Sequence, residues 1–399
     1  MSVAVFLLIF LALILWFSID YTVGKQLHKK HLKEHLYPMR QGQLTLFSNG
    51  NTLYKDLFNE IKQATNEIHI LFYIVKHDQI SKEFLEILSQ KAKEGVTVRL
   101  LLDLIGSFQL PRKLIKQLKQ NGAQFAYCNK PKLPFFFFTL NHRNHRKITI
   151  IDGRTGYLGG FNIGQEYLGL DPNLGNWKDY HLKITGEGLI DLQQQFLVDW
   201  KKATKNRLEN HVKGPFPTDV KTASFRFIAT EGRQLEKQFL SLIEQAKKEI
   251  WIGTPYFIPS KTIMNALLQA LSKGVNIIIL VPMKADHLLV KEAAFSYFPP
   301  LLQAGARIFR YYYGFYHSKT IIIDETVCDV GTANFDKRSL FLNEEINCYI
   351  YDQTFIQELR KNFWRDIEQA EELLLEDLLG RTLLDYSKQG VAKLIDQFL

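Results

Sequence analysis

One structural unit occurs twice along the chain, so the fold must contain two equivalent halves. The apolar run Glu67–Ile74 matches Glu249–Tyr256, and a helical pattern follows each run and closes at a glycine, Gly95 or Gly274. Glycine suits a helix C-terminus, and an apolar strand-type run comes next in both places. Because strands and helices alternate and the strands are apolar throughout, the pattern predicts α/β halves whose sheets are covered on both faces.

The predicted architecture is therefore two α/β sandwich halves related by a pseudo-twofold axis. A chain of 399 residues is long enough for two such cores. The seam falls near Gly214–Pro217, a cluster of glycine and proline with turn character. We expect the halves to span residues 45–214 and 215–399. A site on the axis would receive the same side chains from each half.

Each half carries a His-x-Lys motif, an aspartate five residues after the lysine and an asparagine seventeen residues after the histidine. The two sets are His145, Lys147, Asp152 and Asn162, and His317, Lys319, Asp324 and Asn334. Residues i and i+2 of a strand share a face, so each histidine and lysine would project into one cleft. Two imidazoles, two ammonium groups and two carboxamides suit a phosphodiester, whose charged oxygens need cations and donors.

A metal or another cofactor is not expected at these motifs. Lysine is no ordinary metal ligand, and the acidic cluster typical of metal-dependent phosphoryl transfer is absent around both histidines. His28, His31 and His35 fall at helical spacing, but neighbouring lysines would repel a cation. The three cysteines show no CxxC spacing, which argues against structural zinc and fits a reducing compartment.

The N-terminal segment predicts a retained membrane anchor. Ser2–Ile19 carries no charge and spans about 27 Å as a helix, close to the hydrocarbon thickness of a bilayer. No basic residue precedes this run and no small-residue cleavage site follows it, which argues against a signal peptide. Lysines from Lys25 to Lys33 place the rest of the chain in the cytoplasm by the positive-inside rule. We expect a single-pass anchor over 1–21 and a basic juxtamembrane linker over 22–44.

The paired motifs are similar to the HKD motifs of the phospholipase D superfamily. The closer resemblance is to bacterial cardiolipin synthases, and it covers roughly residues 45–399. It rests on the stretches Asn144–Lys147, Gly175–Asp179, Thr254–Pro259, Asn334–Leu340 and Asn343–Glu345. Many members of that family carry two predicted spans where this chain has one.

The resemblance implies a two-step displacement through a phosphohistidine. It implies that His145 is the nucleophile and that His317 is the general acid and base. The side chains that would hold phosphate oxygens are Lys147, Lys319, Asn162 and Asn334.

The resemblance also implies an orienting carboxylate for each histidine, supplied across the twofold axis. Glu345 would orient His145, and Asp179 would orient His317. Asp152 and Asp324 belong to the motifs and so to the candidate catalytic set. For these two aspartates a structural role, pairing near the strand end, is the favoured interpretation.

The implied reaction converts two phosphatidylglycerol molecules into cardiolipin and glycerol, at an anionic membrane. The net charge of +9 fits an anionic partner without choosing among nucleic acid, membrane and phosphorylated substrate. A phospholipase D hydrolase differs only in its acceptor and remains open, as does the oligomeric state. A phosphodiester nuclease is disfavoured by the anchor and by the absence of a nucleic-acid module, and a non-catalytic lipid-binding scaffold by the intact motifs.

Two aromatic runs and the C-terminal stretch carry further expectations. Phe135–Phe138 and Tyr311–Tyr316 precede the two motifs at matching places. Four adjacent phenylalanines cannot all face one side of an element, so both core packing and lipid contact remain open for them. Phe355–Leu379 has an amphipathic helical pattern and predicts a helix packed on the sheet.

Overall fold

The structure is a computed structural model that describes residues 3–30, 35–212, 222–232, 234–287, 289–378 and 383–396. The N-terminal elements are α1 (Val3–Lys30) and β1 (His35–Leu36). The first half contains β2 (Arg40–Phe47), α2 (Gly50–Gln63), β3 (Glu67–Phe72), α3 (Gln79–Lys93), β4 (Thr97–Asp103), α4 (Arg112–Gln120), β5 (Gln124–Cys128), α5 (Phe136–Asn141), β6 (Ile148–Ile151), β7 (Thr155–Gly159), β8 (Asn176–Lys178), β9 (His181–Gly186) and α6 (Gly188–Thr204).

The second half repeats the order of the core elements, with α9, β18 and α13 added, β14 in place of α5 and α11 in place of β8. It contains β10 (Ala223–Glu231), α7 (Leu235–Gln245), β11 (Glu249–Gly253), α8 (Lys261–Ser272), β12 (Asn276–Pro282), α9 (Val290–Ala294), α10 (Phe298–Gln303), β13 (Arg307–Tyr311), β14 (Gly314–Tyr316), β15 (Thr320–Ile323), β16 (Val327–Gly331), α11 (Lys337–Phe341), β17 (Glu344–Ile350), α12 (Gln353–Ile367), β18 (Ala370–Leu373) and α13 (Leu383–Leu394).

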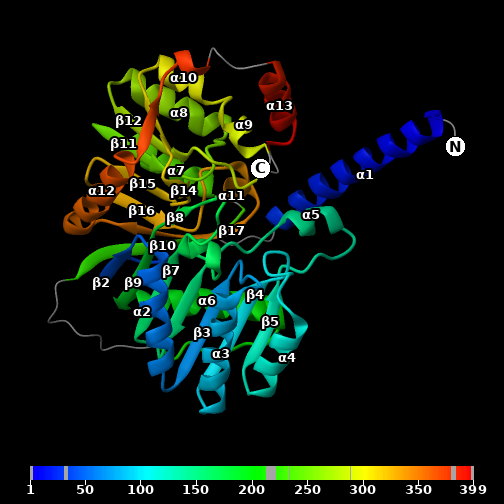
Figure 1. Cartoon of the computed structure of the whole chain (residues 1–399), viewed down its shortest axis with the longest axis vertical. Coiled ribbons are helices and arrows are strands. Elements are labelled where there is room, and N and C mark those ends of the chain that lie inside the picture. Colours follow the sequence, from blue (N-terminus) through cyan, green and yellow to red (C-terminus); the bar gives the residue numbers. More distant parts are fainter. Residues whose placement is uncertain are drawn as a thin grey trace.

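A single continuous sheet runs through both halves in the described part of the chain. Its strand order is β18-β13-β12-β11-β15-β16-β17-β10-β2-β9-β7-β6-β3-β4-β5. The two halves join where β10 pairs antiparallel with β2, with Phe225 opposite Arg40. Outward from this junction each half has the same sequence of partners, so the pseudo-twofold axis passes close to it (Figure 1). The predicted pair of related α/β halves is confirmed, and they share one sheet.

Helices cover both faces of this sheet, as the apolar strands predict. In β3, Ile68 and Ile70 face the helices α2 and α3, whereas Leu71 faces α6. The buried positions Leu53, Leu57 and Ile61 of α2 are four residues apart and form the stripe that packs on the sheet. In the second half, α7 and α8 cover one face, and α12 covers the other beside α6.

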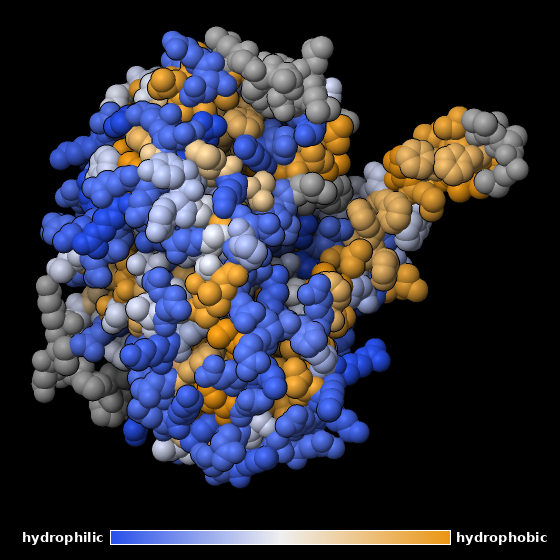
Figure 2. All heavy atoms as spheres, in the orientation of Figure 1, coloured by the Kyte–Doolittle hydropathy of each residue, from blue (hydrophilic) through white to orange (hydrophobic). Residues whose placement is uncertain are grey.

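The N-terminal helix extends beyond the boundary expected from sequence. Every side chain from Val5 to Ile19 is exposed, and α1 projects from the body as an apolar rod (Figures 1 and 2). The helix continues past residue 21 to Lys30, and strand β1 then pairs with β10, so the predicted linker over 22–44 contains regular structure. β2 begins at Arg40, ahead of residue 45. The predicted seam at 214–217 lies outside the described residues.

The phenylalanine run of the first half docks α1 onto the body. Phe137 lies against Phe17 in a tilted arrangement with ring centroids 4.7 Å apart, and the backbone N–H of Phe138 donates to Asp20 Oδ1 at 2.8 Å. Phe138 is buried, whereas Phe136 is 42% exposed. Phe135, Phe137 and Phe138 therefore pack around the helix end, and Phe136 is exposed beside it.

The C-terminal stretch departs from its predicted helix. Helix α12 ends at Ile367, and the chain returns as β18, which pairs antiparallel with β13. Arg307 Nε lies 2.7 Å from Glu372 Oε1, and Arg310 pairs with Glu371 in the same ladder. The free edge of β13 and these charge pairs outweigh the local helical pattern.

We expect α1 to hold the chain in membranes as a spanning segment. The helix is long and apolar enough to cross a bilayer, and its exposed side chains have no other cover in the structure described. Full-length protein should remain with membranes in high salt or carbonate, while a variant lacking residues 2–16 should be released. This deletion leaves Asp20 in place to dock the helix end. Release of full-length protein by salt would contradict a spanning anchor and indicate peripheral, electrostatic binding.

Candidate active site

The two His-x-Lys motifs lie in extended segments just before β6 and β15, not on the strands themselves. His145 N–H donates to Glu344 O at 2.9 Å, and His317 N–H donates to Lys178 O at 2.7 Å. Each histidine is therefore held by the backbone of the opposite half. Both imidazoles reach one cleft between the halves, with a volume of roughly 1630 Å³ including open solvent.

A carboxylate from the second half holds the first histidine. His145 Nδ1 lies 2.9 Å from Glu345 Oε2, at the start of β17. Glu345 is fixed in turn, because it accepts hydrogen bonds from Thr332 Oγ1 at 2.6 Å and Ser339 Oγ at 2.9 Å. With Nδ1 engaged, Nε2 of His145 is the nitrogen that remains for the cleft.

The second histidine has the reciprocal arrangement. His317 Nδ1 lies 2.6 Å from Asp179 Oδ2, which belongs to the first half. The other oxygen of Asp179 accepts the N–H of Tyr180 at 2.8 Å. A Cβ at Gly160 would lie 2.0 Å from Asp179, so the second glycine of the Gly-Gly turn makes room for this carboxylate. The resemblance led us to expect both cross-axis pairs, and the structure places these residues together.

Both motif lysines are buried behind the histidines. Lys147 Nζ donates to His145 O at 2.7 Å, and Lys319 Nζ contacts His317 O and lies 3.4 Å from Asp179 Oδ2. Burial lowers the pKa of both ammonium groups, while the nearby carboxylates Glu345 and Asp179 oppose that shift. The two motif lysines therefore lie under the cleft floor, whereas Lys76 and Arg338 line the cleft itself.

Burial also lowers the pKa values of the two imidazoles. It brings the pKa of His145 to about 4, even though Glu345 opposes the shift. Burial and the adjacent Lys319 hold the pKa of His317 well below its usual range. Both rings are therefore neutral at pH 7. The contact with Glu345 assigns Nδ1–H and a lone pair on Nε2 to His145, whereas Nδ1 of His317 also meets Lys319 Nζ at 2.5 Å.

The two asparagines line the cleft on opposite sides. Asn162 Oδ1 accepts the N–H of Ile74 at 3.1 Å, and its amide donates to Tyr167 Oη at 3.2 Å. Asn334 is 6% exposed, and its Oδ1 is buried without a hydrogen-bond partner in the protein. The pair has the symmetry that the repeated motif predicts.

The motif aspartates lie outside the cleft. Asp152 accepts the N–H groups of Thr65, Asn66 and Glu67 at 2.7–2.9 Å, ahead of β3. Asp324 accepts three N–H groups ahead of β11 in the same way, from Lys247, Lys248 and Glu249. Their inclusion in the candidate catalytic set finds no geometric support, because each one ties a turn to the start of a strand. The structural role favoured for these two aspartates is therefore a pairing with backbone N–H groups next to a strand.

Aromatic rings around the histidines were not assigned from sequence. Tyr73 meets His145 edge-on at 5.0 Å between centroids, and Trp177 lies 4.6 Å from His317. Tyr256 approaches His317 edge-on at 6.4 Å. The stretches that resemble the family include Trp177 and Tyr256, which is the signal that would have marked them.

A buried charge cluster behind His145 also escaped the sequence reasoning. Arg146 is fully buried, donates to Asp199 Oδ1 at 2.5 Å and lies 3.6 Å from Glu344 Oε2. Its Nε donates to Glu345 O at 3.1 Å, which ties the motif segment to β17. Asp199 was visible as a charge on an otherwise buried face of α6, but its partner was not.

Comparison with known proteins gives one consistent result. The family model described as "Cardiolipin synthase, PLD-like domain" matches residues 57–183 and again 239–367. The minor cardiolipin synthase ClsB of Bacillus subtilis (strain 168) is 42% identical over 99% of this chain and 100% of its own length. The major cardiolipin synthase ClsA of the same strain is 37% identical over 92% of this chain and 78% of its own length.

Solved structures match the fold at low sequence identity. A phosphatidylserine synthase of Haemophilus influenzae Rd KW20 superposes with a TM-score of 0.69 and 16% identity, covering 94% of this chain and all of that one. A polyphosphate kinase of Porphyromonas gingivalis gives a TM-score of 0.59 over 84% of this chain and 49% of its own, again at 16% identity. At such identities the likeness concerns the fold alone.

Proposed function

Since the chain belongs to the cardiolipin synthase family of phospholipase D-type phosphatidyltransferases, we propose that it converts two phosphatidylglycerol molecules into cardiolipin and glycerol. One observation carries the proposal. Two imidazoles, each held at Nδ1 by a carboxylate of the opposite half, present Nε2 to a single cleft. That arrangement supplies one nitrogen to attack phosphorus and another to move the proton of the glycerol oxygen.

In the first step, Nε2 of His145 attacks the phosphorus of one phosphatidylglycerol. The bond from phosphorus to the glycerol oxygen breaks, and His317 gives its proton to that oxygen, so free glycerol departs. In the second step, His317 takes the proton from the headgroup hydroxyl of another phosphatidylglycerol. The hydroxyl oxygen attacks phosphorus, the phosphorus–nitrogen bond breaks, and His145 is restored as cardiolipin forms.

The negative charge of the substrate supports the separate roles of His145 and His317. Lys147 and Lys319 lie beneath the cleft with depressed pKa values, because the nearby carboxylates oppose the effect of burial without cancelling it. A phosphodiester in the cleft adds negative charge and raises the pKa of His317 toward the protonated form that the first step needs. Asn334 and Asn162 line the cleft, and their side-chain N–H groups would donate to phosphate oxygens of the substrate.

The proposed setting is the cytoplasmic face of an anionic membrane. The apolar part of α1 is followed, within the same helix, by a basic turn that contains Lys25. Basic residues next to a membrane span favour the cytoplasmic side. Phosphatidylglycerol would reach the cleft from that surface without leaving the membrane.

Incubating the purified full-length protein with phosphatidylglycerol alone tests the proposed reaction. We expect cardiolipin and free glycerol in equal amounts, also in EDTA, because the reacting groups are imidazoles and ammonium groups of the protein. Phosphatidic acid as the main product would instead indicate a hydrolase. DNA cleavage without lipid turnover would indicate a nuclease. Complete loss in EDTA with recovery on adding a divalent ion would contradict the mechanism, whereas mere stimulation by salt would not.

A further inference from the structure

A segment beside the cleft differs in length between the two halves. Gly122 follows Gly95 by 27 residues, whereas Gly305 follows the equivalent Gly274 by 31. In the first half the segment after β4 is short and packs tightly, since Ser107 Oγ donates to Tyr73 O at 3.1 Å and accepts the N–H of Val75 at 3.0 Å. In the second half the longer segment after β12 forms α9 and stands away from the sheet.

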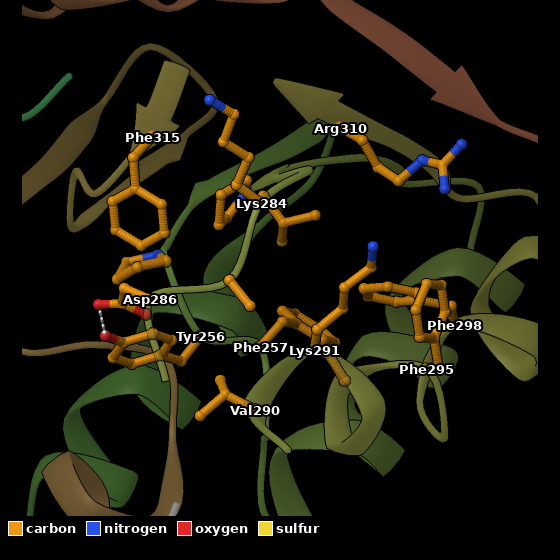
Figure 3. A pocket seen from close by; sticks show the side chains of 15 residues that line it. Tyr256, Phe257, Lys284, Asp286, Val290, Lys291, Phe295, Phe298, Arg310 and Phe315 are labelled. Atoms are coloured by element: carbon orange, nitrogen blue, oxygen red, sulfur yellow. Dashed lines mark hydrogen bonds between the residues drawn. The ribbon is translucent and has the colours of Figure 1, made fainter. Parts of the chain in front are cut away.

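An apolar crevice lies under α9, and we call it the α9 crevice (Figure 3). Its total volume of about 440 Å³ includes open solvent, and the crevice itself is narrow. Its walls are mainly carbon and include Phe257, Val290, Ala294, Phe295 and Phe298. The crevice adjoins the catalytic cleft, because Tyr256, Asp286 and Val290 line both.

Basic side chains stand at the rim of this crevice. Figure 3 shows Lys284 and Arg310 along one edge of it and Lys291 reaching up from α9 opposite them, with Asp286 bound to Tyr256 at the left. Lys284 Nζ donates to Asn173 O at 2.9 Å, and Arg310 pairs with Glu371. Lys291 lies over Phe295 at 5.9 Å, and no carboxylate within the described ranges pairs with it.

The proposed reaction needs a place of this kind on the His317 side of the cleft. The leaving glycerol and the incoming hydroxyl occupy the same position, opposite the attacking His145 and beside His317. In the acceptor lipid, three carbons and one oxygen separate that hydroxyl from a second phosphate, and the diacylglycerol lies beyond it. A cationic rim followed by an apolar wall matches this order of groups. In Figure 1, α9 lies on the side of the body from which α1 projects.

We propose that the α9 crevice binds the acceptor phospholipid, with its phosphate near Lys291 and the ester-linked part of its diacylglycerol against Val290, Ala294 and Phe298. This assignment rests on the proposed transferase function. It distinguishes the two halves, because the longer segment that forms α9 follows β12, whereas its counterpart after β4 is short, and so it separates the donor side from the acceptor side. A bound acceptor hydroxyl competes with water for the same phosphohistidine through its high effective concentration.

Filling the crevice tests the assignment, because the acceptor lipid, ethanol and water all react with the same phosphohistidine. Full-length protein is given phosphatidylglycerol in detergent micelles with ethanol, and cardiolipin, phosphatidylethanol and phosphatidic acid are measured together. In Ala294→Phe we expect the ratio of cardiolipin to phosphatidylethanol to fall at least about tenfold, because the lipid acceptor is excluded and the small alcohol is not. Continued phosphatidylethanol formation shows that the variant is folded and still forms the intermediate.

Lys291→Ala gives a second, milder test. It should lower the same ratio roughly threefold to tenfold by raising the KM for phosphatidylglycerol as acceptor. Lys261→Ala, an exposed lysine on α8 of the same half, is the matched control and should leave the ratio unchanged. An unchanged ratio in Ala294→Phe and Lys291→Ala would overturn the assignment, as would a proportional fall of all three products. If wild-type protein forms no product from phosphatidylglycerol, the proposed function fails instead.

Discussion

Replacing His145 by alanine is expected to abolish the covalent phosphatidyl-enzyme and to lower turnover by about 10³-fold or more. The side chain is 8% exposed, Glu345 holds its Nδ1, and the depressed pKa keeps Nε2 unprotonated at neutral pH. His317 cannot take over the attack without losing the proton donor, and His287, which also lines the cleft, is largely exposed. The measurement is trapping with radiolabelled substrate followed by peptide mapping, alongside steady-state cardiolipin formation.

His317→Ala should behave differently, because it removes the proton donor and leaves the attacking nitrogen. Glycerol is a poor leaving group that needs protonation, so turnover of phosphatidylglycerol should also be lost. A nitrophenolate leaves without a proton, so a nitrophenyl phosphodiester should still give a burst and leave its label on His145. His211→Ala, at an exposed position outside the cleft, is the control and should retain full activity. Label on His317 in the His145→Ala protein would reverse the two roles.

Replacing Glu345 by glutamine should lower kcat by roughly 10²–10⁴-fold with little change in KM. The carboxylate holds His145 as the Nδ1–H tautomer and stabilises the positive charge that the ring gains on attack. An amide can present its NH₂ group to Nδ1, which favours the wrong tautomer. The same reasoning applies to Asp179→Asn at His317, whose Nδ1 lies 2.6 Å from the carboxylate.

The pH profile separates this role from a purely structural one. Glu345 raises the pKa of His145, so its removal should lower that pKa below about 4 and shift the acid limb of the burst phase to lower pH. A carboxylate that only stabilised the fold would leave the acid limb in place. Asp329→Asn is the matched control, since Asp329 is buried in the same half, bonds Asn347 and does not line the cleft. Burial raises the pKa of Asp329 well above its usual range, so an amide is a close substitute.

The sequence alone determined the features that depend on local pattern. Apolar strand runs, helices that close at glycine and the doubled motif predicted two related α/β halves and a shared cleft. They did so because periodicity and turn chemistry act over a few residues. The spacing of His145 to Asn162 and of His317 to Asn334 likewise placed the same groups on both sides of the cleft. Ser2–Ile19 predicted the apolar helix from composition and length.

Tertiary structure decided which distant edges and side chains meet. Glu345 lies 200 residues from His145, and Asp179 lies 138 from His317, so only the family resemblance suggested those pairs. Pairing with the free edge of β13 made part of a predicted helix into the strand β18. Contacts with α5 dock the end of the anchor helix on the body of the protein. The α9 crevice arises from a few extra residues whose packing no local pattern reveals. Such contacts depend on the competition among all surfaces of the folded chain, which a local pattern of residues does not contain.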